Sequence, residues 1–139
     1  MIGNFPMGIA QSDEYTQSIP GTSFSFKMKP VPAGSIALGP NNTKVNLDAF
    51  YIGAYEVTFD EFNCFREREQ DNDSTSHPAM SYKADAVTRP TPQYVNLTFG
   101  MGDRGGFPMV STTQQAALKY CKWLYEKTGK FYRLPTEAE

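Results

Sequence analysis

The strongest constraint on the fold is the last eight residues of the chain, which are YRLPTEAE. Residues 132–134 form a short extended run, and Pro135 keeps Leu134 out of the α region. Thr136 and Glu139 have the spacing of a capping box, which predicts that a helix begins at Thr136. The chain stops within the first turn of that helix, and a single turn is not stable unless the helix continues and packs. We therefore expect the chain to be the front part of a longer domain.

The front half of the sequence indicates strands that are joined by tight turns. Residues 24–31 alternate apolar and polar side chains, which predicts a half-buried strand. A short strand over 35–38 is followed by Gly-Pro-Asn-Asn at 39–42, a turn sequence. A returning strand is expected over 45–52, so this region is predicted to be an antiparallel hairpin or meander.

Two helices are predicted from capping signals and apolar periodicity. Thr58 and Glu61 form one capping box, and phenylalanines at 59, 62 and 65 give that helix an apolar face. A second helix is expected to begin at Thr112 or Thr113 and to end at Gly129, a left-handed stop. Its predicted buried face carries Ala117, Tyr120, Cys121 and Leu124.

Four segments also carry motifs in a defined order. They are MKPVPAGS at 28–35 with Leu38-Gly39, FYIGAYEVT at 50–58, FPMVS at 107–111, and the segment 120–139 that ends in RLPTEAE. Together they resemble the formylglycine-generating enzyme family, whose members are also called sulfatase-modifying factor domains. One departure is Ala37-Leu38-Gly39, where the family usually has a Met-Gly pair, and this change replaces one apolar residue by another.

The resemblance implies an α+β fold of the C-type-lectin-like kind that is loop-rich and incomplete at the C-terminus. It covers residues 24–139, which we interpret as the front part of a formylglycine-generating-enzyme-like domain. Residues 1–23 are polar, contain Gly and Pro, and lack periodicity, so we predict an N-terminal arm or linker there.

The resemblance also implies a chemistry. Enzymes of the family oxidise a sulfatase cysteine to formylglycine with copper, oxygen and a pair of thiols. In the family these thiols and the calcium sites follow the RLPTEAE motif, where this chain ends. No catalytic, cofactor-binding or metal residue is therefore assigned to this chain, and copper and calcium are implied only for a complete catalytic domain.

Two functions follow from this resemblance. In the first, the chain is the scaffold half of a sulfatase-modifying-factor-type domain, in an oxidoreductase whose partner is a sulfatase polypeptide. In the second, it belongs to a non-catalytic binding or structural protein of the same lectin-like fold, with a protein or glycan ligand. The family also favours an extracytoplasmic location, periplasmic or secreted. A net charge of −2 gives no electrostatic footprint for nucleic acid, and no run of residues is apolar enough for a membrane span.

The two cysteines do not fit the family's chemistry. Cys64 and Cys121 each lie in a predicted helix, where buried free cysteine is the common outcome. A disulfide between them stays open, because the sequence does not give the separation of their Cα atoms. Copper(I) needs converging soft ligands, and these cysteines are expected on the packing faces of separate helices.

Other candidate sites are better explained as structural features. His77 has no positioned partner in the sequence, so we interpret it as a loop histidine. The acidic run 71–74 lacks the Gly and Glu of a calcium loop, and the glycine cluster 100–106 lacks the Lys-Ser/Thr pair of a phosphate loop. Arg133 is predicted to hold strand-end carbonyls or a carboxylate with its planar guanidinium group.

Overall fold

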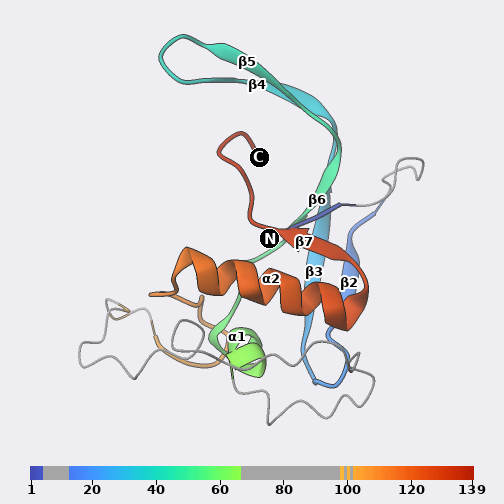
Figure 1. Cartoon of the computed structure of the whole chain (residues 1–139), viewed down its shortest axis with the longest axis vertical. Coiled ribbons are helices and arrows are strands. Elements are labelled where there is room, and N and C mark those ends of the chain that lie inside the picture. Colours follow the sequence, from blue (N-terminus) through green and yellow to red (C-terminus); the bar gives the residue numbers. More distant parts are fainter. Residues whose placement is uncertain (5–12, 67–97, 99, 101) are drawn as a thin grey trace.

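The computed structural model describes residues 1–4, 13–66, 98, 100 and 102–139. These residues form an α+β structure with a five-stranded antiparallel sheet, a separate two-stranded hairpin and two helices. In Figure 1 the hairpin lies at one end of the molecule and helix α1 at the other, while α2 runs beside the sheet. The elements, in chain order, are β1 (Ile2–Asn4), β2 (Tyr15–Ser18), β3 (Ser25–Val31), β4 (Gly34–Leu38), β5 (Thr43–Leu47), β6 (Phe50–Gly53), α1 (Phe59–Arg66), α2 (Gln114–Thr128) and β7 (Phe131–Arg133).

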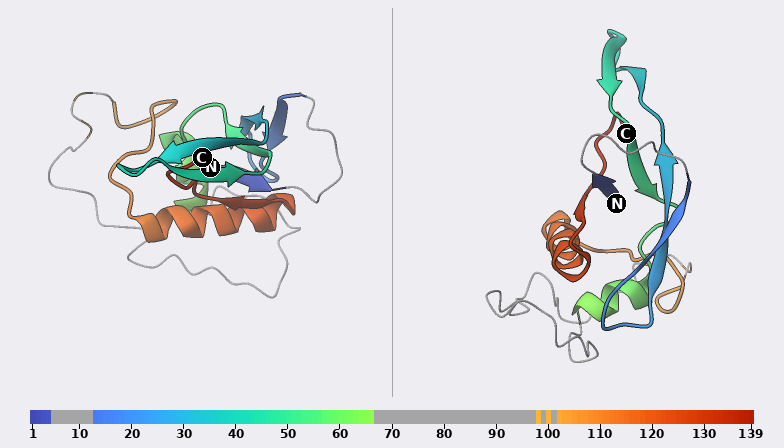
Figure 2. Two further views of the ribbon diagram at one scale, coloured as in Figure 1. Left: turned by 90° about the horizontal axis from the view of Figure 1, so that it is seen from above. Right: turned by 90° about the vertical axis from the view of Figure 1, so that its right-hand side faces the viewer.

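The predicted front hairpin is confirmed, and it continues the main sheet. The pairing of β3 with β6 reaches Val31 and Phe50, and the pairing of β4 with β5 begins at Gly34 and Leu47. Strands β3 to β6 therefore make one long antiparallel ribbon, which is interrupted by two residues on each side (Figures 1 and 2). Gly39, at φ 69°, begins the turn at the tip, and its carbonyl accepts a hydrogen bond of 3.1 Å from the Asn42 amide.

The prediction of an N-terminal arm over residues 1–23 is wrong for the residues that the structure describes there. Strand β1 lies between β6 and β7, with Ile2 opposite Ile52 on one side and Arg133 on the other. Strand β2 pairs with β3 along its whole length, and Ile2 and Ile19 are fully buried. Sequence periodicity missed these strands because they are short and their stability comes from pairing with distant segments.

Both helices begin at the predicted caps. The Thr58 hydroxyl accepts a hydrogen bond of 3.2 Å from the Glu61 amide, as a capping box requires. Thr113, and not Thr112, is the N-cap of α2, and its hydroxyl accepts a bond of 3.1 Å from the Ala116 amide. Gly129 ends this helix at φ 70°, the left-handed conformation that the sequence predicted.

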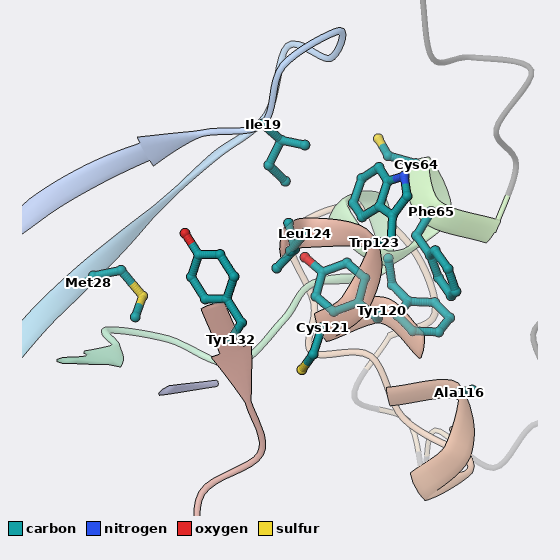
Figure 3. Packing of buried hydrophobic residues seen from close by; sticks show 11 residues of the cluster. Ile19, Met28, Cys64, Phe65, Ala116, Tyr120, Cys121, Trp123, Leu124 and Tyr132 are labelled. Carbon is teal, nitrogen blue, oxygen red and sulfur yellow. The ribbon is translucent and has the colours of Figure 1, made fainter. Parts of the chain in front are cut away.

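The core is an aromatic cluster between the helices and the sheet (Figure 3). Tyr120 of α2 packs on Phe62 and Phe65 of α1, and Trp123 of α2 packs on Phe65, with ring centroids 5.5–5.8 Å apart. Such offset and edge-on pairs stabilise the fold by more than the burial of their apolar area alone. The buried face of α2 includes the predicted Tyr120, Cys121 and Leu124, together with Ala116 and Trp123, whereas Ala117 is only half-buried.

The final segment is held by ionic hydrogen bonds. Arg133 donates to Glu139 from both Nη atoms, at 2.6 Å for the bond from Nη1 to Oε2, and to the Leu134 carbonyl at 3.1 Å. The predicted structural role of Arg133 is therefore confirmed. These bonds, with two more from Thr136, lower the pKa of the Glu139 carboxyl to about 2.

The predicted helix start at Thr136 is wrong for this structure, which has no helix over residues 134–139. Half of the capping box is present, because the Thr136 amide donates to the Glu139 carboxylate at 2.8 Å. Four residues make one turn, and one turn gains too few backbone hydrogen bonds to offset the entropy of ordering it.

The cap of α2 gives a direct test of the fold. Thr113→Ala removes the acceptor for the Ala116 amide and is expected to lower the free energy of unfolding by about 1 kcal/mol. Urea unfolding followed by circular dichroism measures this change. Thr112→Ala is the matched control, because the buried Thr112 hydroxyl makes no hydrogen bond in the described structure. An equal or larger loss in the control would contradict the assignment of the cap.

Candidate functional site

A hollow of about 910 Å³ opens where the main sheet passes into α1. Its walls come from residues 25–27 of β3, the segment 52–58 that links β6 to α1, and Glu61 of α1. Gly106 and Pro108, from the segment before α2, line the opposite side. In the described part of the chain, this hollow is the strongest candidate for a ligand site, because it is large, partly apolar and lined by several polar groups.

Backbone hydrogen bonds fix the first wall. The Gly53 amide donates to the Met1 carbonyl at 2.9 Å, and the Ala54 amide donates to the Lys27 carbonyl at 2.8 Å. The chain turns away from the sheet at this point, which leaves the Tyr55 side chain 83% exposed. The sheet therefore presents an aromatic ring at the edge of the hollow.

The second wall is tied to the first turn of α1. The Phe59 amide donates to the Phe107 carbonyl at 2.9 Å, and the Met109 amide donates to the Val57 carbonyl at 2.8 Å. Gly102 packs against the Phe107 ring so closely that an added Cβ would lie 2.6 Å from it. With φ at 104°, this position is restricted to glycine.

The floor of the hollow contains a buried carboxyl group. Glu61 is only 6% exposed, and its Oε1 accepts a hydrogen bond of 2.8 Å from the Tyr120 hydroxyl. This bond links α1 to α2 across 59 residues of sequence. The sequence identified Glu61 as part of a capping box, but its contact with Tyr120 depends on the packing of the two helices.

Burial determines the ionisation of this pair. Burial raises the pKa of Glu61, and the hydrogen bonds from Tyr120 and from the Thr58 backbone lower it to a smaller extent. Burial, together with the neighbouring Glu61 carboxylate, raises the pKa of Tyr120 well above its usual value. Tyr120 therefore stays a hydrogen-bond donor, and Glu61 is a carboxyl group that gains protons more readily than an exposed one.

The rim of the hollow is suited to binding a polar chain. Lys27 contributes a cation, and its Nζ lies 3.6 Å from Glu14 Oε1 in an exposed ion pair. Glu56 contributes an exposed carboxylate. The exposed ring of Tyr55 lies between these segments and offers a stacking surface. Charges of both signs beside an aromatic ring fit a peptide or a sugar chain better than a single small ion.

The cysteines do not contribute to this hollow. Cys64 and Cys121 are buried on separate helices, as predicted, and no disulfide joins them. Figure 3 shows their sulfur atoms directed to opposite sides of the aromatic cluster. Burial also raises the pKa of the Cys121 thiol, which disfavours the thiolate that metal binding requires. The two thiols therefore do not fit a copper ion.

The structure describes only part of the remaining candidate segments. His77 and the acidic run 71–74 lie outside the described residues. In the glycine cluster, the Gly105 amide donates to the Asp60 carboxylate at 3.0 Å, so this part of the cluster has a structural role. Among the residues that the structure describes, no three His, Cys, Asp or Glu side chains converge as metal ligands.

Comparison with known protein families shows to which family the chain belongs. Residues 4–139 match the sulfatase-modifying factor enzyme 1-like domain, FGE-sulfatase. The chain belongs to this family. The resemblance inferred from the four motifs is thereby confirmed, and the match includes most of the residues predicted to be an arm. Searches of curated proteins and of solved structures gave no significant match. Within the described ranges, neither helix has the length and apolar character needed to cross a membrane.

The Glu61 carboxyl group generates a prediction about pH. Because its pKa is raised on folding, its contribution to stability is present below the unfolded pKa and is lost as pH rises through the folded value. Glu61→Gln keeps an oxygen acceptor for Tyr120 and removes the charge. As pH rises above about 4, the usual pKa of a glutamate side chain, the wild type is expected to lose stability relative to this variant. Urea unfolding at a series of pH values measures the difference.

Glu56→Gln is the matched control, because it removes the same charge from an exposed side chain of the same rim. If the two variants had the same pH profile, the account of Glu61 as a buried acid would be rejected.

Proposed function

We propose that this chain supplies the structural framework of a sulfatase-modifying-factor-type domain, in a protein that oxidises a sulfatase cysteine to formylglycine. The observation that supports this most strongly is the family match over residues 4–139. We further propose that the complete fold is of the C-type-lectin-like kind, with the mixed sheet-and-helix arrangement described above as its front part.

The framework role rests on what the described side chains do. The helices contribute aromatic rings and buried thiols to a core, and the sheet with its linking segment forms the hollow. Both thiols are buried, and burial raises the pKa of the Cys121 thiol. The oxidation chemistry and its copper therefore require groups other than Cys64 and Cys121.

Formation of formylglycine is the direct test of the oxidase function. The full product of the gene would be co-expressed with a sulfatase, and the sulfatase peptide that contains the target cysteine would be analysed by mass spectrometry. The expected result is an aldehyde at that cysteine, which is also formed with Cys64→Ala and Cys121→Ala variants that remain folded. Absence of the aldehyde under aerobic conditions with copper would contradict the proposal.

The second candidate function is a non-catalytic module that binds protein or glycan. The observation that favours it is the exposed Tyr55 ring beside Lys27 and Glu56 at a hollow of about 910 Å³. An aromatic ring with polar neighbours provides contact area at a low entropic cost. In an oxidase the same hollow would hold the substrate polypeptide, so occupancy by a peptide is common to both functions.

Binding of a peptide to this hollow is testable with one substitution. Tyr55→Ala is expected to weaken the binding of a fluorescent sulfatase peptide that contains the target cysteine about tenfold, because it removes a stacking surface. Fluorescence anisotropy measures the affinity. Tyr125→Ala is the matched control, since Tyr125 is another exposed tyrosine but lies on α2, outside the lining of the hollow. An equal effect of both substitutions, or none from either, would exclude the hollow as the peptide site.

A further inference from the structure

The β4–β5 hairpin is the least supported part of the described structure. It extends beyond the five-stranded sheet and makes no extensive contact with any other described helix or strand (Figures 1 and 2). A hairpin of two strands is only marginally stable in water by itself. The surface of this hairpin is therefore available to a binding partner.

One face of the hairpin is apolar. The strand register places Ile36 opposite Val45, Leu38 opposite Thr43, and Leu47 opposite Gly34. Residues that are directly opposite, and those two positions apart along a strand, share one face of a sheet. Ile36, Leu38, Val45 and Leu47 therefore lie on the same face, where Ile36 is 41% exposed.

The outer edge of β5 has a pattern that is complementary to itself. Within the described residues no third strand pairs with this hairpin, so the outer edge of β5 has unpaired backbone groups. From Lys44 to Asp48 the sequence is Lys-Val-Asn-Leu-Asp, with opposite charges at equal distances from Asn46 and apolar residues between. Lys44, Asn46 and Asp48 are all exposed.

We propose that a second copy of the chain binds at this edge, by antiparallel pairing of the two β5 strands about a twofold axis at Asn46. Lys44 of each copy then lies opposite Asp48 of the other, and Val45 lies opposite Leu47. The two hairpins form a four-stranded sheet. Since the twofold axis is perpendicular to that sheet, the apolar faces of both copies lie on the same side and form one continuous surface.

The positions of Lys44 and Asp48 favour a second copy of the chain as the partner and the outer edge of β5 as the place of contact. Within one copy, Lys44 and Asp48 are four residues apart on an extended chain, roughly 13 Å, which is too far for an ion pair. Pairing through the outer edge of β4 would bring no opposite charges together, because Gly34–Leu38 contains none. Only the antiparallel alignment of two β5 strands centred on Asn46 satisfies both charges and both apolar residues.

Charge reversal tests the pairing. Sedimentation velocity of the full chain over a range of concentrations is expected to show a monomer–dimer equilibrium. Lys44→Asp or Asp48→Lys alone places like charges opposite each other twice in the dimer, and is expected to raise the dissociation constant about tenfold or more. The double variant, with both substitutions, restores opposite charges and is expected to recover most of the wild-type dissociation constant.

Lys29→Asp is the matched control, since it makes the same change in charge at an exposed position of β3, outside the hairpin. It is expected to leave the equilibrium unchanged. A wild-type chain that stays monomeric at all concentrations would overturn the proposal. A dimer that is insensitive to both single reversals, or a double variant that is not rescued, would overturn it as well.

Discussion

The hydrogen bond from Tyr120 to Glu61 is the contact on which the rest of this structure depends. It joins the two helices at 2.8 Å beside a cluster of rings, where both residues are almost fully buried. A buried carboxyl group without this donor would be costly, and so would a buried phenol without this acceptor. The aromatic cluster is therefore not only apolar packing, because it also fixes the relative position of α1 and α2.

This position determines the shape of the hollow. The first turn of α1 holds the segment before α2 through the Phe59 and Asp60 amides, and Glu61 forms part of the floor. The sheet contributes the other wall through the Ala54 amide and the exposed Tyr55. The buried residues therefore specify the fold, while the segments above them line the hollow.

Local signals in the sequence predicted the local structure well. The caps at Thr58 and Thr113 and the stop at Gly129 depend on residues three or four positions away, and the front hairpin pairs strands that follow each other in sequence. Strand β1 could not be predicted in this way, because its stability comes from β6 and β7, which are distant in sequence. The Tyr120–Glu61 contact was missed for the same reason. Family membership was predicted, since its motifs are linear, whereas the hollow is assembled from segments that are distant in sequence.

A double-mutant cycle on this contact tests the central claim most directly. Tyr120→Phe removes the donor, Glu61→Leu removes the acceptor, and the double variant removes both. From urea unfolding of the four proteins, the account predicts a coupling free energy of about 1–3 kcal/mol, because each single variant leaves one polar group buried without its partner. A coupling free energy near zero would mean that the two residues contribute independently, and it would contradict the claim that this hydrogen bond holds the helices together.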